Sequence, residues 1–468
     1  IEMFAISKLV RSKNILTTFS VISCIQTIVV YLYVLFLTRF ASETEYAHYI
    51  SITYIVDFTV AISLFGFNLL ILREGEDYIK QNICSILSLS AIIGIIIWSI
   101  CVMMSTNIIL RDYAWSLILI CVQYLYQLGT CFQIKYKQNS IAFVNAVVNF
   151  LFTIVSLLLL LHFNKLDAEN VILVRIVQLV VFAIICYASV IRHIKPADAP
   201  TFRKIWNNLK MAVPIGGASI LGVAIQYIDK LILSTQSVTD IAQYSVARFE
   251  IPFIGIFVAN LSLTLIPSIK ENMQKNNLQL VHDSIRRLFR YGWYFNVIIF
   301  TLLFCNAELV LTVLYSEAYI VSAGLFRIII LVYLFKVVTY TNIIIALGIE
   351  RIIIPRLLIE MVLQVASSLL FLHLWGVTGL AVSLVCILVL WNVPYNIYYF
   401  MKKTNGTLKD ILPLKDMFIF FVKCFVPNFI IVCCMCSEIK SVWKLLITML
   451  LIFVLCFKEI KYIYSNTR

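Results

Sequence analysis

The chain has 468 residues, of which 62% are hydrophobic and only 13% are charged. A soluble globular protein is about 45–50% apolar and about 25% charged, so the composition excludes a soluble enzyme, a disordered protein and a nucleic-acid-binding module. The net charge of +13 requires no nucleic acid partner, because the cytoplasmic loops of membrane proteins accumulate lysine and arginine.

Long apolar segments follow one another along the chain, separated by short polar loops. A membrane-spanning helix needs about 20 apolar residues, so the pattern predicts an all-α integral membrane protein with about 14 transmembrane helices. The expected spans are 15–38, 48–72, 82–104, 113–134, 140–162, 171–191, 211–234, 243–267, 290–314, 322–346, 352–373, 376–400, 417–436 and 441–458.

The basic residues predict the orientation of these spans. Alternate loops hold most of the 37 lysines and arginines, whereas the remaining loops hold Arg39, Arg111, Lys165, Lys440 and Lys444. Positive loops face the cytoplasm, so both termini of this multi-pass protein are expected there. The loops expected on the opposite side are short, which disfavours a polymerase or glycosyltransferase with a large catalytic domain outside the membrane.

A short repeat suggests two halves. Thr44-Glu45-Tyr46-Ala47-His48-Tyr49 opens the second expected span, and Thr239-Asp240-Ile241-Ala242-Gln243-Tyr244 opens the eighth. Parallel repeats of this kind occur in transporters that rock about a central site; the alternative is a coincidence in a biased composition. We therefore expect an N-lobe at 1–191, a basic cytoplasmic linker at 192–210, a C-lobe at 211–400, and two further helices with a cytoplasmic tail at 401–468.

Charged residues lie inside several expected spans. The cations are Arg175, Lys230, Arg248, Arg327, Lys336 and Lys423, and the acids are Asp57, Asp229, Glu250 and Glu360. A charge at the centre of the bilayer costs about 2.5–3.5 kcal/mol, so most of these groups are expected to face a wet cavity or a partner. For those near the end of a span, the alternative is a side chain that reaches out to the lipid headgroups.

Neutral polar residues share helix faces with these charges. They are Gln123, Gln127, Asn145, Asn149, Gln226 and Gln364. Such stripes line polar cavities, but they also hold neighbouring helices together. Interior lysine and arginine form charge-assisted hydrogen bonds with phosphate oxygens, which indicates an anionic, lipid-borne substrate.

Nothing in the sequence predicts catalysis, a metal or a cofactor. The five histidines and 13 cysteines form no metal-binding spacing, and the glycine-rich loop that holds ATP phosphates does not occur. We therefore expect a protein that is not an enzyme. Active transport would draw on an ion gradient, with the intramembrane acids as candidate ion carriers, or on consumption of the product.

Several of these motifs resemble one family. Arg39-Phe40, Glu45-Tyr46-Ala47-His48-Tyr49, Phe65-Gly66 and Arg73 look like the amino-terminal signature of Wzx-type O-antigen flippases, in the polysaccharide exporter branch of the multidrug/oligosaccharidyl-lipid/polysaccharide (MOP) superfamily. Pro214, Asp229-Lys230, Ala242-Gln243-Tyr244-Ser245, Pro252 and Pro267 are similar to residues of its second half. The resemblance fades in the last two spans, and Ala47 replaces the glycine usual in the family.

The resemblance implies a fold and a function. The fold would be that of MATE transporters and MurJ, with two six-helix lobes and two extra helices that could form a groove for a lipid tail. The function would be to move undecaprenyl-pyrophosphate-linked O-antigen repeat units from the cytoplasmic to the periplasmic leaflet of a bacterial inner membrane, for lipopolysaccharide biosynthesis. The expected partners are this lipid-linked oligosaccharide, membrane lipid, and a polymerase and chain-length regulator, with no nucleic acid.

In this hypothesis Lys230, Arg248 and Lys336, together with Arg175 and Arg327, bind the pyrophosphate or acidic sugars. Asp57, Asp229, Glu250 and Glu360 couple an ion or balance the cations. One alternative is a small-molecule antiporter of the MATE type, which would have an acidic lumen. The other is a membrane-embedded polymerase, which would need a large outer loop.

Overall fold

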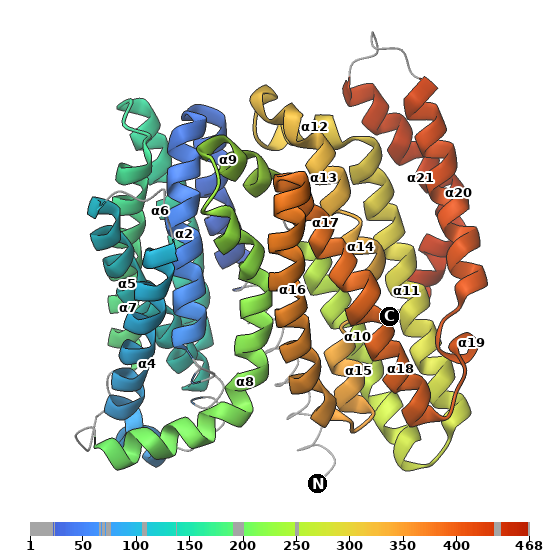
Figure 1. Ribbon diagram of the computed structural model, residues 1–468, viewed down its shortest axis with the longest axis horizontal. Helices are drawn as coiled ribbons and strands as arrows, with labels where there is room; N and C mark the ends of the chain where they lie inside the picture. The colour runs from blue at the N-terminus through green and yellow to red at the C-terminus, as the bar shows by residue number, and fades with distance from the viewer. Residues whose placement is uncertain are drawn as a thin grey trace. The chain divides into compact units, whose positions relative to one another are not determined.

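The computed structural model describes residues 22, 24–64, 67, 71, 76–104, 110–136, 138–190, 201–248, 252–434 and 441–466. The secondary structure within these ranges is helical, and they contain no β-strand (Figure 1). The prediction of an all-α membrane protein is confirmed. The chain divides into two compact units, Ile1–Ser245 and Val246–Arg468.

The first unit contains long helices for the first seven expected spans. They are the helix Cys24–Phe40, α2 (Glu43–Ser63), α4 (Glu76–Met104), α5 (Leu110–Lys135), α6 (Asn139–His162), α7 (Ala168–Val190) and α8 (Phe202–Leu233). A shorter helix, α9 (Val238–Ala247), runs across the boundary of the units. Helix α8 begins inside the segment 192–210 that the sequence predicts to be a linker.

The second unit contains the helices of the remaining spans and several short elements. They are α10 (Pro252–Gln274), α11 (Leu278–Cys305), α12 (Ala307–Leu314), η1 (Glu317–Ser322), α13 (Ala323–Ile329), α14 (Val332–Phe335), α15 (Tyr340–Ala346), η2 (Glu350–Ile352), α16 (Ile353–Trp375), α17 (Val377–Ile387), η3 (Leu388–Asn392), α18 (Val393–Thr404), α19 (Leu408–Ile411), α20 (Leu414–Cys434) and α21 (Ser441–Asn466).

Helix lengths and hydropathy show a multi-pass membrane protein. Within the described ranges, 10 helical segments are long and apolar enough to cross a bilayer, and Cys24–Phe40 and Trp443–Phe457 are shorter apolar helices. Helices α2 and α10 overlap the second and eighth expected spans, with bounds that differ by several residues. Large apolar side chains such as Val144, Leu151 and Val155 of α6 are exposed, as expected of a surface that faces lipid. The number and orientation of the spans stay predictions.

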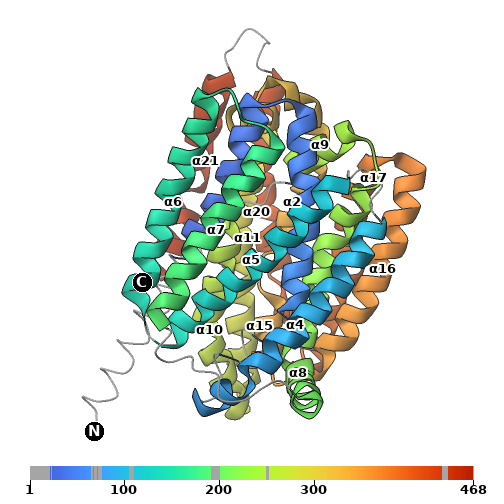
Figure 2. The ribbon, with the colours of Figure 1, turned by 90° about the vertical axis from the view of Figure 1, so that its left-hand side faces the viewer.

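Helix α2 lies at the centre of the first unit, where it packs against α4, α5, α7 and α8 (Figures 1 and 2). Its start is fixed locally, because the Ser42 side chain accepts a hydrogen bond from the Glu45 backbone N–H at 3.3 Å, which satisfies one free donor of the first turn. The Glu45 carboxylate in turn accepts the backbone N–H of Ala168 at 2.7 Å. This bond joins the first turn of α2 to the first turn of α7.

Two expected spans of the second unit are not continuous α-helices. The span at 322–346 is divided into α13, α14 and α15, with Lys336 in a non-helical conformation after α14. The span at 376–400 contains the π-helical turn η3 between α17 and α18. Such interruptions free backbone groups inside the membrane, and they occur where protein or water can satisfy those groups. Here Asn296 of α11 donates to the backbone carbonyls of Tyr333 at 2.9 Å and Lys336 at 3.1 Å.

Candidate functional site

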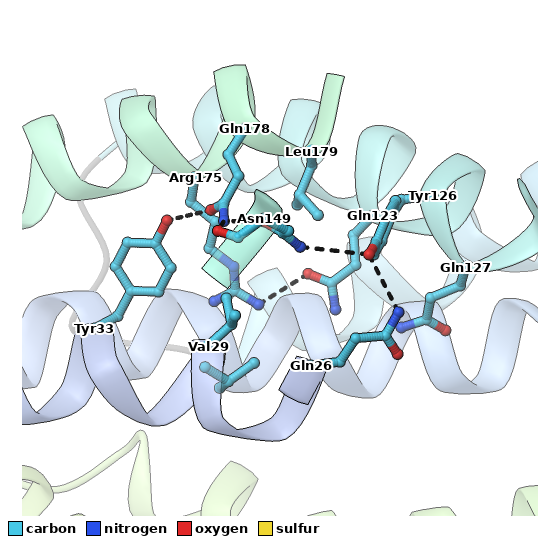
Figure 3. A pocket seen from close by; sticks show the side chains of 11 residues that line it. Gln26, Val29, Tyr33, Gln123, Tyr126, Gln127, Asn149, Arg175, Gln178 and Leu179 are labelled. Carbon is cyan, nitrogen blue, oxygen red and sulfur yellow. Dashed lines mark hydrogen bonds between the residues drawn. The ribbon is translucent and has the colours of Figure 1, made fainter. Parts of the chain in front are cut away.

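A cavity of about 130 Å³ in the first unit is lined by several polar side chains (Figure 3). Four helices supply its lining, namely Cys24–Phe40, α5, α6 and α7. The lining residues are Gln26, Val29, Val30, Tyr33, Gln123, Tyr126, Gln127, Asn149, Arg175, Gln178 and Leu179. Most of them are polar, although they lie on helices that are apolar overall.

Arg175 of α7 is the only charged side chain of this lining, and it is 5% exposed. Its guanidinium donates to the Tyr49 hydroxyl at 3.1 Å and to the Gln123 side-chain carbonyl at 3.0 Å. It also lies 3.5 Å from the Asp57 carboxylate, which accepts a hydrogen bond from the Gln123 side-chain amide at 2.7 Å. The planar, multidentate guanidinium suits this arrangement, and it joins α7 to α2 and α5.

A second set of side chains continues this network along the cavity. The Gln178 amide donates to Asn149 and, at 2.6 Å, to the Thr153 hydroxyl, and its carbonyl accepts from the Tyr33 hydroxyl. Asn149 donates to the Tyr126 hydroxyl at 3.4 Å. Figure 3 shows Tyr33, Tyr126, Asn149 and Gln178, which come from four helices, along one polar strip. The strip gives each buried amide at least one partner, as buried polar groups require.

The size of the cavity limits what it can hold in this conformation. A water molecule takes about 30 Å³, so the cavity has room for about four waters. Sites for drug-sized molecules are about 300–1,000 Å³, so a sugar headgroup does not fit inside. The charge of Arg175 is also balanced by Asp57. In the described conformation this cavity is therefore too small for a sugar headgroup, and its cation is already paired.

A separate polar cluster lies in the second unit. Arg356 and Glu360 are one turn apart on α16, with the guanidinium 3.9 Å from the carboxylate and both side chains less than 10% exposed. Asn396 accepts from Arg356 at 3.0 Å, and Asn392 donates to Glu360 at 2.8 Å. Asn392 is the last residue of η3, so the π-helical turn presents its amide to the buried carboxylate.

Gln364 extends the polar face of α16 by one more turn. It donates to the Ser368 hydroxyl at 3.0 Å and to the Ser383 hydroxyl of α17 at 3.3 Å. The neutral part of this stripe therefore connects two neighbouring helices, which is the alternative that polar stripes leave open.

Lys230 and its neighbours form a third polar site in the first unit. The Lys230 ammonium lies 5.2 Å from the ring centre of Tyr54 on α2 and 4.6 Å from that of Tyr227 on its own helix. Both distances allow cation–π attraction. The adjacent Asp229 is fully buried and accepts a hydrogen bond from Tyr244 at 2.8 Å, whereas Gln226 is exposed.

The other predicted site residues are dispersed. Arg327 forms an ion pair with Glu308 at 3.1 Å, where both side chains are partly exposed. Asn145 donates to the Cys186 sulfur at 3.2 Å and does not line the cavity. Arg248 is partly exposed just after α9, Lys336 is at the break after α14, and Glu250 lies outside the described residues.

Lys423 of α20 is paired as well. Its ammonium lies 2.7 Å from the Glu459 carboxylate of α21. Arg175 and Arg327 are also paired with acids, so these three cations are neutralised within their own units. The sequence predicts intramembrane cations but does not name Glu308 or Glu459 as partners.

The sequence analysis missed several residues of the polar clusters. In the first unit they are Gln26, Tyr33, Tyr126, Thr153 and Gln178. Gln178 is three residues after Arg175 and therefore shares its helix face, which is a signal that spacing could have given. The tyrosines gave no such signal, because most tyrosines of a membrane protein lie in interfacial belts or in the core.

Comparison with solved structures defines the fold. The structure is similar to the lipid II flippase MurJ in an inward closed conformation, with a TM-score of 0.70, 13% identity, and coverage of 96% of this chain and 99% of that chain. It is also similar to an inward-facing multidrug resistance MATE family transporter of the MOP superfamily, with a TM-score of 0.60, 11% identity, and coverage of 81% and 95%. For a MOP superfamily transporter from Pyrococcus furiosus the TM-score is 0.51 and the identity is 13%, with coverage of 83% of this chain and 93% of that chain.

The likeness to these structures shows that this chain has their all-α membrane transporter fold, over 96% of its length for MurJ and 81% for the MATE family transporter. A family model for polysaccharide biosynthesis proteins matches residues 12–273, which is more than half of the chain. The chain belongs to this polysaccharide biosynthesis protein family. No curated protein sequence matches it.

Proposed function

We propose that the protein is a flippase for a lipid-linked polysaccharide precursor. The substrate would be an undecaprenyl-pyrophosphate-linked O-antigen repeat unit, moved from the cytoplasmic to the periplasmic leaflet of a bacterial inner membrane by alternating access of the two halves. The observation that carries this proposal is the match of residues 12–273 to the polysaccharide biosynthesis protein family. The likeness of the whole fold to a lipid II flippase supports it.

The chemistry of the cations inside the expected spans supports an anionic substrate. We assign Lys230, Arg248, Lys336, Arg175 and Arg327 to the pyrophosphate or to acidic sugars, because arginine and lysine form strong hydrogen bonds with phosphate and carboxylate oxygens. Arg175 is bound to Asp57 in the structure. A substrate anion would therefore have to replace Asp57 as the partner of Arg175. When the substrate leaves, Asp57 would pair with Arg175 again.

The acids take the complementary role in this proposal. Asp57, Asp229, Glu250 and Glu360 would balance the cations while the substrate is absent, or would carry a coupling ion. The carboxylates of Asp57 and Glu360 each contact an arginine in their own unit, which favours charge balance for these two. The two ends of the chain would lie in the cytoplasm, and a polymerase and a chain-length regulator would act on the product.

A gene deletion tests the proposed function. The deletion strain should accumulate lipid-linked single repeat units in the inner leaflet and lose surface O-antigen, and the wild-type gene should restore it. Lys230→Ala and Arg248→Ala should fail to restore it although the protein still inserts. Lys275→Ala is the matched control, because Lys275 lies in an exposed ion pair with Glu271.

Other outcomes would contradict the proposal. Surface polysaccharide that is reduced to a single repeat unit would indicate a polymerase. Normal O-antigen together with increased sensitivity to cationic drugs would indicate a small-molecule antiporter. Normal O-antigen from both cation variants would leave the flippase in place and remove Lys230 and Arg248 from the substrate site.

A further inference from the structure

The first part of α8, residues 202–210, differs in direction from the other long helices of the first unit. Figure 1 shows it running across the foot of α4 before the helix turns into its apolar part. Figure 2 shows the same segment end-on beside the lower end of α4. The apolar part of α8 that is long enough to cross a bilayer begins only at Gly216.

One face of this segment packs against α4. Ile205 and Leu209 pack against the apolar cluster that contains Ile86 and Leu89. Asn208 is 1% exposed and accepts a hydrogen bond from the Tyr78 hydroxyl at 2.5 Å. These contacts come from apolar packing and a buried hydrogen bond, so they hold the segment in a fixed place on the unit.

The contact with Tyr78 also places the segment beside one end of a candidate membrane span. The apolar, membrane-crossing part of α4 is Tyr78–Met103, so Tyr78 marks its first residue. Asn208, which is bonded to Tyr78, therefore lies beside the start of this candidate span, where we expect the boundary between the hydrocarbon and the headgroups. Lys204 donates to the backbone carbonyl of Gln81 at 3.4 Å, one turn further into α4.

The opposite face of the segment is exposed and basic. Arg203, Trp206, Asn207 and Lys210 are exposed, and their spacing of i, i+3, i+4 and i+7 places them on one face of a helix. The Lys210 ammonium lies 5.5 Å from the centre of the Trp206 ring, and Trp206 is 49% exposed. Tryptophan prefers the headgroup level of a bilayer, and this face carries two positive charges beside it without an acid among its four residues.

We propose that residues 202–210 form an interfacial helix that binds anionic phospholipid headgroups, through Arg203 and Lys210 on either side of Trp206. The basic loops predict that this side of the protein is cytoplasmic, and the cytoplasmic leaflet is rich in anionic lipids that attract basic segments. Phosphate oxygens accept hydrogen bonds from both cations. The inference does not depend on what the protein transports.

Fluorescence quenching tests this binding in the full-length protein. The protein is reconstituted into phosphatidylcholine vesicles that contain a small, equal fraction of brominated phosphatidylglycerol or brominated phosphatidylcholine. The chain has seven tryptophans, so the signal of Trp206 is taken as the difference between the wild-type protein and Trp206→Phe. We expect brominated phosphatidylglycerol to quench this signal more strongly than brominated phosphatidylcholine does.

Charge removal then identifies the residues. One charge near an anionic surface corresponds to about a fivefold change in association constant. The double variant R203Q/K210Q should therefore lose most of the preference for phosphatidylglycerol. K210Q alone should lower the association constant for phosphatidylglycerol by about fivefold. The matched control is K402Q/K403Q, which removes two basic side chains from the last turn of α18 and should keep the preference.

Three results would overturn the inference. Trp206 could be quenched equally by both lipids, or not at all, in the wild-type protein. R203Q/K210Q could retain the wild-type preference. K402Q/K403Q could abolish the preference as completely as R203Q/K210Q does, which would show an effect of overall charge rather than of this segment.

Discussion

The ion pair between Arg175 and Asp57 makes a quantitative prediction for the stability of the first unit. Asp57→Asn keeps the size of the side chain but leaves the guanidinium without its counter-charge. The two groups are 3.5 Å apart, and their side chains are 6% and 25% exposed. Breaking a fully buried pair costs about 3–5 kcal/mol, so with Asp57 a quarter exposed we expect about 3 kcal/mol.

This loss should be visible in a thermal melt. For a unit of this length, 1 kcal/mol shifts the melting temperature by about 2–4 °C, so Asp57→Asn should melt about 6–12 °C below the wild-type protein. Cys101 and Cys186 are buried in the first unit. A thiol-reactive dye therefore reports unfolding of the detergent-solubilised protein. Glu271→Gln is the control, because the exposed pair with Lys275 is worth less than about 1 kcal/mol.

The double variant D57N/R175Q separates a buried charge from a lost contact. Removing the guanidinium as well eliminates the unpaired charge, so the double variant should melt above D57N. The coupling between the two sites should be about 1–3 kcal/mol, as for residues in contact. If D57N melts like the wild-type protein, or if the two single effects simply add, the pair does not stabilise the unit and the argument for a balanced cation fails.

Three further predictions concern the second unit. A Cβ at Gly292 would lie 1.9 Å from the backbone carbonyl oxygen of Val337, whereas nothing lies within 4 Å of a Cβ at Gly324. Gly292→Ala should therefore lower the free energy of unfolding by about 1–3 kcal/mol or more. Gly324→Ala is the control and should melt like the wild-type protein. Glu360→Gln leaves a buried arginine without its counter-charge and should cost about 3 kcal/mol, measured in the same melt; an unchanged melting temperature would contradict this. Hydrogen bonds from the Thr407 side chain and backbone hold the pKa of Asp410 below its ordinary value of 3.8. The stabilisation from these bonds is therefore present above pH 3.8 and is lost as the pH falls through the lowered pKa. Thr407→Ala should weaken this acid dependence of the melting temperature, and an identical pH profile would contradict the role of the hydroxyl.

Much of the fold could be predicted because the membrane makes the sequence simple to interpret. Each span needs a long apolar segment with its backbone bonds satisfied internally, and those segments are visible one after another. The internal breaks could not be predicted in the same way. The break at Lys336 and the π-helical turn before Val393 depend on the amides of Asn296 and Asn392, which contact backbone or side chains of other elements.

The polar clusters could be predicted in part. The residues Asp57, Gln123, Asn149 and Arg175 were all found as polar groups in apolar spans, and the structure brings them together in one unit. Their pairing was not predictable from one sequence, because the helices that carry them are far apart in the chain and spacing shows only which residues of one helix share a face. For Arg175 the sequence left an interior position and a position at the headgroups equally open. Its partners on α2 and α5 decide for the interior.

Reconstitution measures the proposed transport most directly. The purified protein is placed in liposomes that carry a fluorescent undecaprenyl-pyrophosphate-linked repeat unit in both leaflets, and a membrane-impermeant glycosidase is added outside. With a flippase present, the enzyme should cleave nearly all of the repeat units, because those of the inner leaflet reach the outer surface. Cleavage that stops at the outer-leaflet fraction, as in protein-free liposomes, would contradict the proposed function.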